Sequence, residues 1–233
     1  MRFRGPILRS ILAAILLLLG LLGRPAGAEG ARPAGFVDAA DVVDGLVVEM
    51  RYVGTNNFVG TAIDGYEAAR CLLTSQAAQA LAAVQRDLSA RGLGLKVYDC
   101  YRPLRAVAHF RRWARDTGDV KQKRAFYPDV DKRNLFALGY LSTRSSHARG
   151  STVDLTLVTR RDGAEVDMGS PFDFFGTRSH LRTAEIGPAQ SRNRFLLVEA
   201  MARRGFRASS KEWWHFTLAN EPFPATSFDF PVR

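Results

Sequence analysis

One segment, SSHARGSTVDLTLV at residues 145–158, constrains the fold of this chain more than any other. Apolar and polar residues alternate in its second half, which predicts a β-strand over 152–158 with one apolar face. Asp154 then points away from that face. His147 precedes a tight turn that can fold it back beside Asp154, because Gly150 gives the backbone the necessary freedom. The segment therefore predicts a strand that carries a polar pair opposite an apolar layer.

A second segment, KEWWHFTL at residues 211–218, predicts another strand of this kind. The alternate residues Trp214, Phe216 and Leu218 share one face of a strand over 213–218, and His215 lies on the opposite face. From there His215 can project toward His147 and Asp154. Two imidazoles and one carboxylate, with one coordination position left open, form the ligand set of a catalytic zinc site.

Glu212 lies three positions before His215, so on an ideal strand the two side chains would point to opposite faces. They come together only if Glu212 lies just before the strand, on a bend. A glutamate beside the metal can act as general base for a water whose pKa the zinc lowers to about 7. The alternative is that each residue is an ordinary packed histidine or a capping acid. The spacings H-x6-D and E-x-x-H alone leave that alternative open.

The N-terminus predicts export of the chain. Arginines precede an almost unbroken apolar run at 11–22, and Ala26 and Ala28 form the small-x-small pattern of a cleavage site. We expect a signal peptide over 1–28 and a periplasmic or otherwise exported mature chain. A membrane anchor is the alternative, but the run is shorter than the roughly 20 apolar residues that span a bilayer. We therefore expect no stable membrane span after cleavage.

The mature chain of 205 residues is long enough for one domain with a sizeable core. We expect a flexible lead-in at 29–35 and a single domain over 36–233. Without the signal peptide the chain has 29 basic and 23 acidic residues, a net charge of +6. The basic residues are scattered, and none alternate with aromatic residues as a single-strand binding platform requires. Nucleic acid is therefore not an expected partner, and the sequence does not define the oligomeric state.

Periodicity predicts both helices and strands. We expect helices over 75–91, between Pro103 and Gly118, and over 191–204, and strands over 93–101, 152–158 and 213–218. The last helix should present an apolar stripe of Phe195, Val198 and Met201. The elements do not alternate regularly enough for a doubly wound parallel sheet. We therefore expect an α+β domain with a central, mostly antiparallel sheet flanked by helices.

Several stretches together resemble a known family of zinc peptidases, the VanX-like D-alanyl-D-alanine dipeptidases. The matching stretches are YVGTNNFVG, DGYEAARC, YDCYRPLRAV, YLSTRSSHARGSTVDLTL, MGSPFDFF, RSH, EWWHF and FDFPV. The resemblance runs from about residue 36 to the end of the chain. It implies a zinc D,D-peptidase fold of the Hedgehog-like architecture, one Zn²⁺ per chain, and hydrolysis of the dipeptide D-Ala-D-Ala.

The resemblance also implies roles for individual residues. His147, Asp154 and His215 are the zinc ligands, and Glu212 is the general base. Arg102, in YRP, stabilises the oxyanion that forms when water attacks the scissile carbonyl, since a fixed guanidinium strengthens its interaction with a developing negative charge.

Substrate selection is implied by a further set of residues. Asp173, in FDFF, pairs with the free amino group of the substrate, while Ser145, Tyr52 and Tyr66 line the small substrate pocket. A buried carboxylate at a fixed distance from the zinc selects a chain with one residue before the scissile bond. Such a residue makes no sense in a D,D-carboxypeptidase that trims longer peptidoglycan peptides, which is one alternative. A non-catalytic peptide-binding domain is another, but it predicts a broken ligand set.

The two cysteines depart from the family pattern. Cys100 replaces a residue that is often small, and Cys71 lies near an aliphatic position. In an exported chain they indicate a Cys71–Cys100 disulfide that closes a loop of about 30 residues. Two buried thiols are the alternative, and zinc ligation by cysteine is disfavoured because no C-x-x-C is present. Of the other histidines, we expect His109 on the surface. For His180 we expect a hydrogen bond beside the site or a place near a helix N-cap, because a fourth protein ligand would close the metal site.

Overall fold

The computed structural model describes Met1 and residues 30–233, so the predicted signal peptide lies outside the described residues. Its centre is a five-stranded sheet in the order β2-β4-β5-β7-β6, in which only the β2–β4 pair is parallel. The strands are β2 (Val47–Val48), β4 (Leu93–Asp99), β5 (Thr152–Thr159), β6 (Phe206–Ala208) and β7 (His215–Leu218). A separate antiparallel pair joins β1 (Phe36–Asp38) to β3 (Leu72–Thr74).

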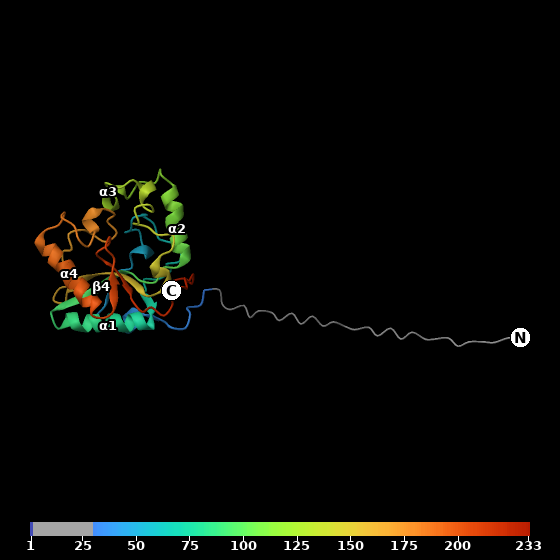
Figure 1. Cartoon of the computed structure of the whole chain (residues 1–233), viewed down its shortest axis with the longest axis horizontal. Coiled ribbons are helices and arrows are strands. Elements are labelled where there is room, and N and C mark those ends of the chain that lie inside the picture. The colour runs from blue at the N-terminus through green and yellow to red at the C-terminus, as the bar shows by residue number, and fades with distance from the viewer. Residues whose placement is uncertain (2–29) are drawn as a thin grey trace.

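Helices lie on both sides of the main sheet. They are α1 (Ser75–Ser89), α2 (Leu104–Arg115), the short α3 (Lys123–Phe126) and α4 (Pro188–Ala202). In Figure 1, α1 lies below β4 and α4 lies to its left, whereas α2 and α3 lie above it. This arrangement confirms the predicted α+β class with a mostly antiparallel central sheet. Within residues 30–233, no helix combines the length and the apolar character needed to cross a membrane.

The helix boundaries follow local capping chemistry. The Thr74 hydroxyl accepts a hydrogen bond from the Ala77 amide at 3.3 Å, as an N-cap residue does at the start of α1. The first residue of α2 directly follows Pro103, close to its predicted start. Helix α4 begins at Pro188, three residues earlier than predicted, because a proline in the first helical turn has a suitable φ and needs no amide partner.

The buried face of α4 is shifted by about one position from the predicted apolar stripe, of which only Met201 is fully buried. Phe195 and Val198 are only half-buried, whereas Arg194 and Leu197 are fully buried together with Met201. A charged residue therefore takes a place on the buried side of the helix. Hydrophobic periodicity cannot anticipate this, because it assigns every arginine to the solvent.

Both faces of β5 are buried. The face that includes Leu155 packs in the hydrophobic core, as the alternation predicted. The opposite face, with Asp154, is also covered, so this side chain is only 2% exposed. An aromatic cluster lies above it, in which the Phe58 ring contacts Phe110 at 4.8 Å and Phe175 at 5.0 Å between centroids. The polar face of the sheet that carries Asp154, here called the polar row, is therefore enclosed rather than open to solvent.

The predicted Cys71–Cys100 disulfide is present, with a Cα–Cα distance of 5.2 Å. It joins the residue before β3 to the residue after β4, so it connects the small sheet to the large one. The Tyr101 amide also donates to the Leu72 carbonyl at 2.9 Å. These bonds fix the chain where it leaves β4, next to the polar row.

Candidate active site

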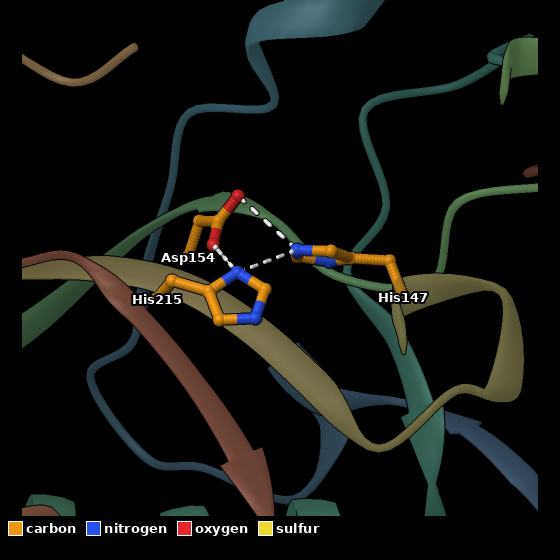
Figure 2. Close-up of side chains that lie close together, drawn as sticks. All are labelled: His147, Asp154 and His215. Carbon is orange, nitrogen blue, oxygen red and sulfur yellow. Dashed lines mark hydrogen bonds and ion pairs between the residues drawn. The ribbon is translucent and has the colours of Figure 1, made fainter. Parts of the chain in front are cut away.

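The two predicted histidines and the aspartate converge on one point. Asp154 on β5 lies directly opposite His215 on β7, and His147 comes from a 3₁₀ turn, Ser146–Arg149, just before β5. Figure 2 shows the three side chains pointing toward one another. His147 Nε2 lies 3.3 Å from both His215 Nδ1 and Asp154 Oδ2, and His215 Nδ1 lies 3.0 Å from Asp154 Oδ1. Three ligand-type atoms thus face a common centre within 4.8 Å of one another.

The nitrogen of each imidazole that faces away from this centre has its own partner. His147 Nδ1 lies 2.7 Å from the Cys100 carbonyl, which makes Nδ1–H the donor and leaves the Nε2 lone pair free. His215 Nε2 lies 3.3 Å from the Ser146 hydroxyl, which leaves Nδ1 facing the centre. This is the pattern of metal-binding histidines, which are oriented by a hydrogen bond from the other ring nitrogen.

The turn that carries His147 depends on Gly150. Its φ of +79° is in the left-handed region, and its amide donates to the His147 carbonyl at 3.0 Å. A Cβ at this position would collide with the Phe36 ring. The glycine noted in the sequence is therefore required both for its backbone conformation and for lack of space.

Glu212 precedes β7 in a turn. Glu212 and His215 are therefore not both on a strand, where side chains three positions apart would point to opposite faces. The strand begins at His215, later than the predicted residue 213, and the His215 amide donates to the Glu212 carbonyl at 3.2 Å. The turn returns the carboxylate to within 3.6 Å of His215 Nδ1. Burial, reinforced by the negative charge of Asp154 and opposed by His215, raises the pKa of Glu212 to about 7.

Arg102 lies at the same centre and is held rigidly. Its Nε and Nη2 donate to Asp99 Oδ2 at 2.9 and 2.8 Å, and its Nη2 lies 3.6 Å from Asp154 Oδ2. The guanidinium stacks 5.2 Å from the ring centroids of Tyr52 and Phe110. Burial by itself would lower the pKa of Arg102, but Asp99, the Tyr52 and Tyr66 hydroxyls and Asp154 together outweigh burial and raise the pKa, so the charge is permanent.

Asp99 is a residue of the site that the sequence analysis missed. It is fully buried and also lies 3.4 Å from His147 Nδ1, so one carboxylate contacts both Arg102 and a candidate ligand. Simple alternation places Asp99 on the apolar face with Val97. A β-bulge between Val97 and Asp99 instead brings Asp99 opposite Asp154. The only signal in the sequence is its position three residues before Arg102.

Asp173 lies in the same pocket, with a strained backbone. It is the only non-glycine residue with a positive φ, +61°, among residues 30–233. The side chain is 4% exposed, and the Tyr52 hydroxyl donates to Asp173 Oδ2 at 2.8 Å. Burial, together with the charge of Asp154, raises the pKa of Asp173 well above its usual range.

A pocket of about 260 Å³ surrounds these groups. Its lining includes the predicted residues Ser145 and Tyr52. Tyr66, in contrast, is not part of the lining. Its hydroxyl donates to Asp99 Oδ1 at 2.6 Å, so it lies behind the site and supports the buried carboxylate rather than contacting the pocket.

The two remaining histidines take no part in the ligand group. His180 Nε2 lies 3.4 Å from the hydroxyl of Tyr140, which lines the pocket. This is consistent with the expected hydrogen bond near the site. His109 is only partly exposed, because its Nδ1 lies 3.0 Å from Asp64 Oδ1. His109 therefore lies near the surface, in contact with Asp64.

An α+β domain with a His–Asp–His centre, an adjacent glutamate and a fixed arginine has the site of a metal-dependent hydrolase. The family model described as D-ala-D-ala dipeptidase, Peptidase_M15, matches residues 32–233. The chain belongs to this family and is a metallopeptidase, which confirms the enzyme class and the resemblance predicted from its motifs.

Curated relatives match over most of the chain. The D-alanyl-D-alanine dipeptidase of Enterococcus faecium is 39% identical over 199 residues, covering 85% of this chain and 98% of that protein. The protein of the same name from Enterococcus faecalis is 41% identical and covers 85% and 98%. The one from Escherichia coli is 37% identical and covers 82% and 90%.

Proposed function

We propose that this chain hydrolyses D-alanyl-D-alanine to two D-alanine molecules, with one zinc ion held by His147, Asp154 and His215. The donor set fits zinc, because two imidazoles and one carboxylate converge within 4.8 Å, and the outer nitrogen of each imidazole has a hydrogen-bond partner. A zinc ion in this position would polarise the scissile carbonyl and lower the pKa of a water molecule.

Glu212 and Arg102 then have separate roles at the scissile bond. Glu212, with a pKa of about 7, takes a proton from the attacking water and can return it to the leaving amine. Arg102 keeps its charge and its orientation through Asp99, so it can stabilise the developing oxyanion without reorganising. The aromatic residues around the pocket exclude bulk water, which strengthens both interactions.

The observation that carries the choice of a dipeptide is the environment of Asp173. Its buried carboxylate has one hydrogen-bond donor, the Tyr52 hydroxyl, and no cationic side chain within 4.0 Å among residues 30–233. A buried carboxylate without a cation is unfavourable, and the ammonium group of a dipeptide supplies the missing charge. The names of the relatives point to the same substrate.

The carboxypeptidase alternative is disfavoured by this same residue. A wall peptide with several residues before the scissile bond has no ammonium group at that position, and it would leave Asp173 unpaired. The non-catalytic alternative predicts a broken ligand set. Here the three candidate ligands, Glu212 and Arg102 lie together.

We also propose that the enzyme acts outside the cytoplasm, on D-Ala-D-Ala released during cell-wall turnover. Two observations support this location. Residues 1–28 have the pattern of a cleavable signal peptide, and Cys71 and Cys100 form a disulfide, a bond that persists in oxidising compartments.

The proposal is tested with the purified chain lacking residues 1–28. We expect about one zinc per chain and cleavage of D-Ala-D-Ala but not of L-Ala-L-Ala. N-acetyl-D-Ala-D-Ala should be cleaved roughly a hundred- to several thousand-fold less efficiently in kcat/KM, because it leaves Asp173 without a cation. The Asp173→Ala variant should narrow this gap. Equal cleavage of the acetylated or longer peptides would make carboxypeptidase the better assignment, and a metal-free active enzyme would refute the zinc centre.

A further inference from the structure

One cationic side chain in the pocket has no role in the mechanism above. Arg102 and Arg144 are the only lysine or arginine residues that line the pocket among those described. Arg102 is committed to Asp99 through two hydrogen bonds. Arg144 lies three residues before His147, on the segment that leads into the ligand turn. The pocket therefore contains a second positive charge, in addition to the one beside the scissile bond.

The backbone of Arg144 is fixed, but its guanidinium is free. The Ser142 hydroxyl accepts from the Arg144 amide at 3.1 Å and donates to the Arg144 carbonyl at 3.0 Å. No carboxylate lies within 4.0 Å of the guanidinium in the part of the chain that the structure describes, and the side chain is exposed. This differs from Arg102, which pairs with Asp99. Arg149 likewise pairs with Glu221 at 2.8 Å.

A free dipeptide carries two charges, and only one of them has a partner so far. Its ammonium group matches Asp173, but its terminal carboxylate enters a pocket whose other acids, Asp154 and Glu212, repel it. Lys211 does not offer an alternative cation, because its Nζ donates to the Leu138 carbonyl and the residue does not line the pocket. Arg144 remains as the available cation, with a planar fork of donors that suits a carboxylate.

We propose that Arg144 binds the terminal carboxylate of the substrate, and so selects chains that end one residue after the scissile bond. This inference rests on the proposed dipeptidase function and deepens it. Asp173 and Arg144 would then bind the two charged ends of the substrate and so select its length. The interaction is made equally in the bound substrate and in the transition state, so it should appear mainly in KM.

The test compares D-Ala-D-Ala with D-alanyl-D-alaninamide, which lacks the negative charge. With the zinc-loaded wild-type enzyme we expect the amide to have a KM at least ten-fold higher. Arg144→Ala should raise KM for the free acid roughly ten-fold with little change in kcat, and should make the acid and the amide nearly equivalent. Arg144→Lys should restore part of the preference. Arg133→Ala is the matched control, because this exposed arginine pairs with Asp131 and does not line the pocket.

Binding measured by calorimetry separates this inference from the proposed function. The zinc-loaded Glu212→Gln protein should bind the free acid at least ten-fold more tightly than the amide, and Arg144→Ala should remove the difference. If the wild-type enzyme fails to hydrolyse D-Ala-D-Ala but this preference holds, the proposed reaction is wrong and the carboxylate site stands. If Arg144→Ala keeps the preference for the free acid, or if neither ligand binds, the role of Arg144 is overturned.

Discussion

Two arginines of this enzyme are buried in opposite electrostatic settings. Arg102, in the active site, donates twice to the carboxylate of Asp99 and lies near Asp154. Arg194, on α4, is 0% exposed and has no carboxylate within ion-pair distance among residues 30–233. It donates instead to backbone carbonyls of Met168, His180 and Arg178 at 2.7 to 2.9 Å.

The pKa values of the two groups differ accordingly. Burial lowers the pKa of the Arg194 guanidinium to about 10, because carbonyl dipoles replace only part of its hydration. At Arg102 the same effect of burial is outweighed by Asp99 together with Asp154 and the hydroxyls of Tyr52 and Tyr66, and the pKa is raised. Arg102 is thus a permanent charge at the centre where we propose that the oxyanion forms. Arg194 instead has a structural role, because its hydrogen bonds connect backbone carbonyls of the loop that carries Asp173.

This contrast predicts that changes at the active site reduce the rate and leave the fold intact. The largest effect is expected for Glu212→Gln, which removes the proton acceptor but keeps the volume. We expect kcat to fall by roughly 10²- to 10⁴-fold, with zinc content and thermal midpoint near those of the wild type. Steady-state kinetics, metal analysis and a thermal melt measure the three quantities. Near-normal kcat would remove Glu212 from the mechanism.

Arg102→Ala should come next. The loss of one oxyanion-stabilising group costs roughly 10²- to 10³-fold in kcat, with a smaller change in KM. Arg102→Lys should recover little of this rate, because a single ammonium cannot reproduce two donors toward Asp99. The kcat values of both variants against D-Ala-D-Ala give the answer, and a rise confined to KM would instead assign Arg102 to substrate binding.

Arg194→Ala should reverse the pattern, with a loss of stability. It leaves buried carbonyls without donors and a cavity beside Trp213, which together cost about 3 kcal/mol in the free energy of unfolding. Urea unfolding of the mature chain measures this. Arg204→Ala is the control, since that arginine forms an exposed pair with Asp87. A variant as stable as the wild type but slow would place Arg194 among the residues that act on the chemistry.

Tyr52→Phe should have the smallest effect. It removes the hydroxyl that donates to Asp173, while the ring keeps its place among the aromatic residues. We expect KM for D-Ala-D-Ala to rise by roughly 2- to 10-fold, with kcat changed less. A larger fall in kcat than rise in KM would show that Tyr52 contacts the reacting atoms.

Much of the candidate ligand set could be predicted from the sequence, because its placement depends on local rules. Alternation in β5 and β7 placed Asp154 and His215 on one face, and Gly150 marked the turn that returns His147. The spacing to His215 also suggested Glu212 as general base, whereas the roles of Arg102 and Asp173 came only from the resemblance to the family. The bend before His215 was required by phase alone, and the structure contains it.

The parts that could not be predicted depend on contacts distant in sequence. Arg194 is buried because carbonyls of a loop 14 to 26 residues earlier surround it, and no periodicity encodes that loop. Tyr66 was placed in the pocket wall, but its hydroxyl reaches Asp99, which lies 33 residues later in the chain. Asp99 itself was hidden by the bulge in β4, where strict alternation gives the wrong face.

The bulge also determines which part of this enzyme can be transferred to another protein. Asp154 and His215 sit on neighbouring strands in regular register, so any antiparallel sheet can present that pair. On the neighbouring strand β4, Asp99 reaches the same face only because a β-bulge inserts one extra residue between Val97 and Asp99. A designer who grafts the ligands and the glutamate onto a regular sheet would leave the arginine and one histidine without their shared carboxylate. The smallest unit that can be transferred is therefore three strands with one β-bulge, rather than the two short segments that carry His147, Asp154, Glu212 and His215.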